Sequence, residues 1–69
     1  MNIVLLKIKL LEKGTNIKKL SEVIGISVSA FYQKLNKDGD FRRNEIKAIR
    51  DYLNLTEQEV NSIFFSDMV

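Results

Sequence analysis

Two short amphipathic segments flank the three-residue break Gly25-Ile26-Ser27, and this spacing restricts the fold more than any other feature of the chain. Both segments carry apolar residues every three or four positions, which is the period of one face of an α-helix. Gly25 accepts the positive φ that ends a helix, and Ser27 can cap the next one. A turn this short that contains Gly sets two helices at about 90–120°. The sequence therefore predicts a helix-turn-helix over residues 17–36.

The same helical period continues through the rest of the chain, divided by glycines and capping residues. Thr15 and Asn16 are candidate caps after Gly14, and Thr56 and Glu59 have the spacing of a capping box. The sequence thus predicts an all-α fold, a compact bundle of five short helices with no sheet. These helices are expected over residues 2–13, 17–24, 28–36 and 42–53 and from Thr56 onward, with a turn at 37–40.

Apolar residues on one face of each segment form the expected core. The first segment is more apolar than one face requires, so Leu5, Ile8 or Leu11 is expected to be left over for a partner. The tail offers a second candidate dimer surface, made of Phe64, Phe65, Met68 and Val69. Core packing is favoured for Phe64 and left open for Phe65. The expected core residues are Ile3, Leu6, Leu10, Ile17, Leu20, Ile24, Phe31, Leu35, Ile46, Ile49, Leu53, Val60, Ile63 and Phe64.

Composition excludes several classes of function. A chain of 69 residues is expected to form one domain, residues 1–69. It has no Cys and no His, which removes disulfides, thiolate chemistry, the commonest general base and the commonest metal ligand. No spacing gathers a nucleophile with a base, so we predict no enzyme, no cofactor, no metal site and no small-molecule substrate. Short apolar runs and the absence of a signal-peptide pattern predict a cytoplasmic protein without a membrane span.

Charge is divided unevenly along the chain. Residues 1–50 hold all 11 Lys and Arg and five acidic residues, a net charge of +6, whereas residues 51–69 hold four acidic residues and no base. A basic body suits a polyanion such as nucleic acid, although a solvated charged surface would look the same.

The stretch IKKLSEVIGISVSAFYQKLN, residues 17–36, resembles the helix-turn-helix of the Cro/repressor-like (XRE) family. Nearly the whole chain is similar to the short Cro-like repressors of bacteriophages and prophages. The resemblance implies a lambda repressor-like DNA-binding domain whose recognition helix is 28–36. The residues that match the family pattern are Ser21, Gly25, Ile26, Ser27, Phe31 and Asn36.

The resemblance also places four side chains of the recognition helix toward the major groove, namely Val28, Ser29, Tyr32 and Gln33. Gln33 can pair with both N6 and N7 of adenine, and Val28 can pack on a thymine methyl group. The alternatives are a packing role at the helix start for Val28 and, for Tyr32, a ring on the core with its hydroxyl in solvent.

Basic residues stand where helices begin, at Lys18 and Lys19 and again at Arg42 and Arg43. An exposed cation at a helix N-terminus costs about 0.3–1 kcal/mol, so these positions suggest that an anion binds there. The family often has Gln at the position of Ile17, and the two lysines next to Ile17 could replace its phosphate contact. The predicted phosphate contacts are Lys18, Lys19, Lys34, Asn36, Lys37, Arg42 and Arg43.

Together these features predict a sequence-specific repressor that binds operator DNA as a homodimer at the nucleoid. The alternative is a protein-binding modulator, an antirepressor or co-repressor that pairs with another phage repressor. The acidic last third of the chain and the absence of Arg on the recognition face keep this alternative open.

Overall fold

The computed structural model describes residues 1–36 and 41–65, and every described regular element is helical. The predicted all-α bundle is therefore confirmed. The five helices of these residues are α1 (Ile3–Glu12), α2 (Ile17–Ile24), α3 (Val28–Asn36), α4 (Arg43–Leu53) and α5 (Glu57–Phe64). The predicted turn at 37–40, which includes Lys37, lies outside the described residues, as do Met68 and Val69.

Capping side chains set the helix starts close to the predicted ones. The side chain of Asn2 accepts the Leu5 N–H at 3.0 Å, so α1 begins at Ile3 rather than at residue 2. Asn16 accepts the Lys19 N–H at 2.9 Å and is the cap of α2. The other candidate cap, Thr15, has a different role, because its hydroxyl lies 3.0 Å from that of Tyr52 and ties the loop before α2 to α4.

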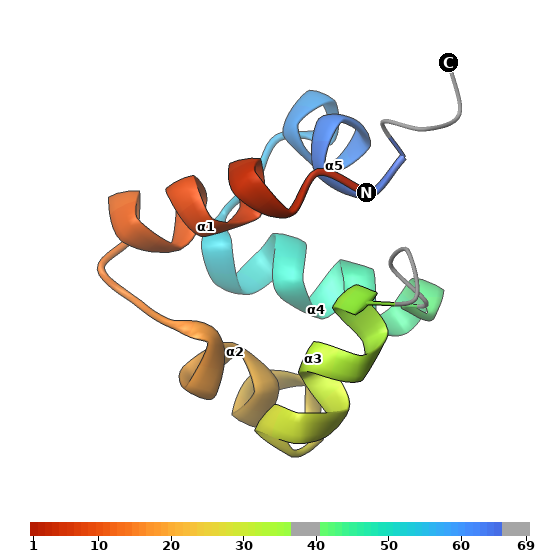
Figure 1. Ribbon diagram of the computed structural model, residues 1–69. Helices are drawn as coiled ribbons and strands as arrows, with labels where there is room; N and C mark the ends of the chain where they lie inside the picture. The colour runs from red at the N-terminus through yellow and green to blue at the C-terminus, as the bar shows by residue number, and fades with distance from the viewer. Residues whose placement is uncertain (37–40, 66–69) are drawn as a thin grey trace.

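Helix α4 lies at the centre of the molecule (Figure 1). It packs against α2, which in turn packs against α3, and on its other side it contacts α5. Helix α1 runs beside α5, and the N–H of Asn2 donates to the Ile63 carbonyl at 2.7 Å. The helix-turn-helix and the α1–α5 pair thus occupy opposite sides of α4.

The buried core agrees closely with the predicted stripes. Of the predicted residues, Ile3, Ile17, Ile24 and Ile46 are half-buried at its edge, and the others are buried. Leu55 and Phe41 are among the core residues that the apolar stripes did not predict. Leu55 is buried directly after Asn54, whose positive φ ends α4. The ring of Phe41 lies edge-on to Phe31 at 5.3 Å and to Phe64 at 5.7 Å, so it joins α3 to α5.

The surplus apolar residues of α1 are partly as predicted. Of the three residues named as possible surplus, Leu5 is half-buried and packs against the core. Ile8 and Leu11 are exposed, and Val4 lies in line with them, which gives a stripe at i, i+4 and i+7. Leu11 is 79% exposed. At the other end, Phe64 is buried, as predicted, and Phe65 is 40% exposed.

In the part of the chain that the structure describes, no helix has the length and apolar character needed to cross a membrane.

Candidate nucleic-acid interface

The turn between α2 and α3 has the geometry that its sequence predicts. Gly25 adopts a φ of +77°, and its N–H donates to the Glu22 carbonyl at 3.2 Å. The next N–H, that of Ile26, donates to the Ser21 carbonyl at 3.0 Å, which closes the end of α2. Ser27 then caps α3, because its hydroxyl accepts the Ala30 N–H at 3.1 Å.

Ser21 of α2 is only 1% exposed. Its hydroxyl donates within α2, lying 3.0 Å from the Ile17 carbonyl and 2.8 Å from that of Lys18. A buried hydroxyl is costly only when it lacks a partner, and this one is satisfied by its own helix. The small side chain therefore requires no polar partner on a neighbouring helix.

Helix α3 has one buried face and one exposed face. Phe31 and Leu35 are buried, and they fix the helix on the core. The exposed residues fall within an arc of about 140° that begins beside Leu35, at Val28, and extends away from Phe31. They are Val28, Ser29, Tyr32, Gln33 and Asn36. All four predicted base-contact residues are thus brought together on one solvent-facing surface, which we call the α3 face.

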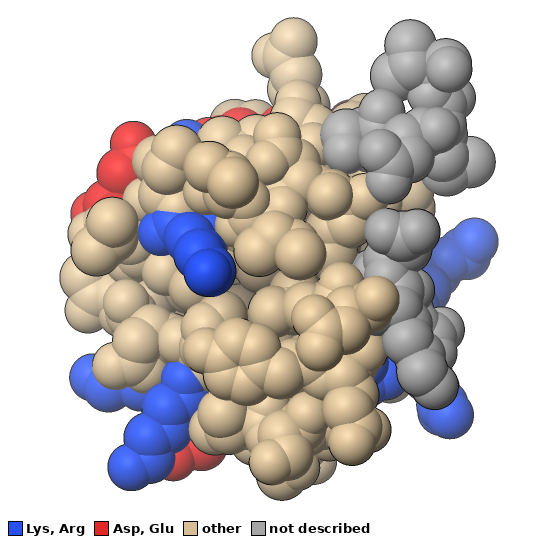
Figure 2. Space-filling view, in the orientation of Figure 1, with Lys and Arg blue, Asp and Glu red and all other residues tan. Residues whose placement is uncertain are grey.

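The α3 face is polar and its side chains are free of internal partners. Within the described residues, Ser29, Tyr32 and Gln33 make no side-chain hydrogen bond or ion pair with the rest of the protein. Tyr32 is 46% exposed and lies outside the buried core. Helix α3 contains no acidic residue, and Figure 2 shows no acidic side chain over it in this view. Nothing on this surface would repel a phosphate backbone.

The first turn of α2 retains the electrostatic mismatch seen in the sequence. Lys18 and Lys19 are both exposed, no acidic residue lies in this turn, and neither lysine has an ion-pair partner among residues 1–36 and 41–65. The first turn of α2 therefore combines two exposed cations with the partial positive charge of a helix N-terminus. This arrangement attracts an anion.

Arg42 and Arg43 were also predicted to attract an anion at the start of α4, but there Glu45 already supplies a negative charge. Its carboxylate accepts the Arg42 N–H at 2.9 Å and lies 3.2 Å from the Lys34 Nζ. Burial alone would raise the pKa of Glu45, but these two partners outweigh burial and hold the pKa below its ordinary value. Arg42 and Arg43 remain exposed, yet the helix start already has its own anion. The spacing Arg42-x-x-Glu45, that of a capping box, was the signal that could have identified this contact.

Lys34 is the predicted phosphate contact that the structure places least favourably. Besides its ion pair with Glu45, its Nζ lies 5.9 Å from the centre of the Phe41 ring, and only 20% of its side chain is exposed. A phosphate would have to compete with these contacts. Lys37 falls outside the described residues.

The described residues contain no cluster of three or more acidic side chains that could hold a metal ion. No curated protein and no solved structure matches the chain. The family model of the Cro/C1-type helix-turn-helix DNA-binding domain matches residues 6–65, which is most of the chain. That family consists of DNA-binding regulatory domains and not of enzymes. The chain therefore belongs to the Cro/C1-type helix-turn-helix family and is a transcription regulator that binds double-stranded DNA.

Proposed function

We propose that residues 1–69 act as one DNA-binding domain of the phage or prophage Cro type and repress transcription by occupying operator DNA as a homodimer. The main support is the α3 face, whose polar side chains are exposed, clustered and free of internal partners. Repression of this kind needs no catalysis, since a bound dimer excludes other proteins from the operator. We place the protein in the cytoplasm, at the nucleoid.

Sequence is read by the α3 face in this proposal. Gln33 pairs with adenine through both its amide oxygen and nitrogen, and Ser29 donates to or accepts from a base edge. Val28 and the ring of Tyr32 pack on thymine methyl groups. Because α3 carries no Arg, the strongest guanine contact of the major groove is absent, and the preferred operators are rich in A·T pairs at the positions that α3 reads.

Phosphates are held at both sides of α3. Lys18 and Lys19 bind one phosphate at the start of α2, where backbone N–H groups add to their charge. Arg42 and Arg43 bind a second at the start of α4. The remaining predicted contacts, Lys34, Asn36 and Lys37, would extend this second group toward the end of the recognition helix.

A dimer is needed because one domain of this size covers only one half-site. Helix-turn-helix proteins gain affinity and specificity by binding two half-sites about one helical turn apart. The exposed stripe of Val4, Ile8 and Leu11 on α1 is our candidate contact between the two copies. Sedimentation should give the mass of a dimer for the native chain. Leu11→Asp should shift it to a monomer, whereas Ser62→Asp, the same new side chain at an exposed position on α5, should not.

The DNA proposal is tested by titrating random duplex at about 50 and 200 mM salt. We expect measurable affinity at the lower salt and a steep loss at the higher salt, because phosphate contacts release counterions. Arg43→Ala should weaken binding to all duplexes alike, whereas Lys13→Ala, at the far end of α1, should have little effect. No detectable affinity at the lower salt would exclude the repressor.

A further inference from the structure

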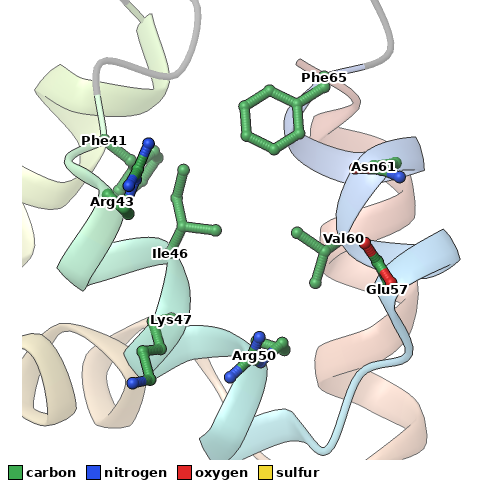
Figure 3. A pocket seen from close by; sticks show the side chains of 9 residues that line it. All are labelled: Phe41, Arg43, Ile46, Lys47, Arg50, Glu57, Val60, Asn61 and Phe65. Carbon is green, nitrogen blue, oxygen red and sulfur yellow. The ribbon is translucent and has the colours of Figure 1, made fainter.

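A groove of about 670 Å³ lies between α4 and α5 (Figure 3). One wall comes from α4 and the other from α5, and the groove opens to solvent. None of the residues proposed to read bases lines it, and of the proposed phosphate contacts that the structure describes, Arg43 alone does. Its chemistry therefore needs a separate explanation.

The α4 wall is a basic row. Arg43, Lys47 and Arg50 follow one another at i, i+4 and i+7, so they lie on one side of α4, and all three line the groove. Arg50 is paired with its neighbour Asp51, with 3.1 Å between Nη2 and Oδ1. Arg43 and Lys47 have no ion-pair partner in the described parts of the chain. The opposite wall offers one acid, Glu57, at the end near Arg50.

The floor of the groove is apolar. Ile46 and Val60 face each other across it, and the ring of Phe65 projects over one end near Phe41 (Figure 3). Phe65 is the last described residue and leaves 40% of its surface in water. An apolar floor beside a row of cations matches a ligand that is itself apolar on one side and negatively charged on the adjoining side.

Two other occupants fit this surface poorly. A second copy placed groove to groove would bring six basic residues together with only two acidic ones, because each copy contributes Arg43, Lys47, Arg50 and a single Glu57. A DNA duplex would satisfy the basic row, but its phosphates would leave the apolar floor without a matching surface.

We propose that this groove binds an amphipathic helix from a different protein, with apolar side chains on the floor and acidic side chains along Arg43, Lys47 and Arg50. Helices laid in grooves are commonly held by apolar anchors at i, i+3 or i+4, and i+7, and the basic residues of α4 that line this groove span the same seven positions, from Arg43 to Arg50. The site belongs to protein–protein recognition, and none of its lining residues lies on the α3 face.

The test uses a fluorescein-labelled helical peptide of about 16 residues, with Leu at anchor spacing and Glu on one flank. Its anisotropy is followed as the full chain is added without DNA. We expect saturable binding of this peptide. A second peptide with Lys in place of every Glu should bind at least about tenfold more weakly, because its charge opposes the basic row.

Two variants locate the peptide on the protein. Lys47→Glu should weaken the acidic peptide about fivefold or more, whereas Lys13→Glu, which changes the net charge equally on α1, should not. Phe65→Ser should weaken it by a similar factor through loss of apolar contact. Because Lys47 and Phe65 are both exposed, these changes should leave the thermal unfolding midpoint near that of the native chain.

Three results would overturn the proposal. The first is equal binding of the acidic and basic peptides, and the second is an equal effect of Lys47→Glu and Lys13→Glu. The third is displacement of the peptide by random duplex together with an equal loss of duplex affinity in Lys47→Glu, which would make the groove part of the DNA surface. Failure of duplex binding with retained peptide binding would instead exclude only the repressor.

Discussion

The polar side chains between α1 and α5 are paired with one another, whereas those of the α3 face have no partner within the described protein. Between α1 and α5, Lys9 is ion-paired with Glu59 and with Glu12, at 3.1 Å for the latter. Glu59 also accepts the Thr56 N–H at 2.9 Å in the predicted capping box. On the α3 face, by contrast, Ser29 and Gln33 make no side-chain hydrogen bond with the rest of the described protein.

This difference separates structural polar residues from residues left for a partner. Groups that are satisfied internally stabilise the fold and have little left to offer a ligand. Groups that remain in water lose little when they exchange water for a base edge. Variants on the two surfaces should therefore divide cleanly into changes of stability and changes of binding.

The largest contrast is expected between the adjacent aromatic residues of α3. Phe31→Ala should lower the free energy of unfolding by about 3–5 kcal/mol, because Phe31 is fully buried against Phe41. Tyr32→Ala should leave stability within about 1 kcal/mol and weaken operator binding. Urea unfolding and duplex titration measure the two effects. A large loss of stability in Tyr32→Ala would mean that its ring supports the core.

Gln33→Ala should act on sequence preference alone. If Gln33 pairs with adenine, its loss should remove about 1–3 kcal/mol of discrimination at one base pair and leave unfolding unchanged. Competition between the selected duplex and single-base variants measures this. Gln58→Ala, an exposed glutamine on α5, is the matched control. An equal loss on all duplexes would remove Gln33 from base reading.

Glu59→Gln should affect stability and not DNA. Its hydrogen bond from Lys9, together with the one from the Thr56 backbone, lowers the pKa of Glu59 from 4.5 to about 2. A carboxyl whose pKa is lower in the folded state stabilises the fold above pH 4.5 and loses that contribution as the pH falls toward 2. The variant should therefore unfold at lower temperature than the native chain at pH 7, with the gap closing between pH 4.5 and 2. A gap that persists at pH 2 would contradict this origin.

Lys18→Ala should change stability only slightly, and in the opposite direction to Phe31→Ala. Removing an exposed cation from the start of α2 should raise the free energy of unfolding by about 0.3–1 kcal/mol. The same change should weaken all duplexes and reduce the slope of log affinity against log salt by about 1. A Lys18 variant that is no more stable, with an unchanged slope, would remove the phosphate site at α2.

Much of the fold could be predicted because local signals agreed with one another. Asn16, Gly25, Ser27 and Thr56 mark helix ends by their own hydrogen bonding, so the boundaries needed no tertiary information. Phe41 could not be placed in this way. It stands outside any helix, and its role comes from two rings that lie ten and more positions away in the sequence.

Those features of the candidate site that depend on one helix alone could also be predicted from the sequence, whereas those that depend on contacts between helices could not. Helical geometry alone divides α3 into a core face and an exposed face, so the exposure of Gln33 and Tyr32 followed from the sequence. Contacts between one helix and another could not be predicted from the sequence. The ion pair of Lys34 with Glu45 depends on how α3 meets α4, and the packing of Leu5 depends on how α1 lies on the core.

Phe41 connects the α3 face with the proposed peptide groove. Its ring touches Phe31 on the inner side of the recognition helix, and it also lines the groove between α4 and α5. A groove ligand that favours one position of this ring would alter the free energy of α3 in its DNA-bound position. Linkage then requires reciprocity, so that operator DNA would change the affinity of the groove ligand by the same factor.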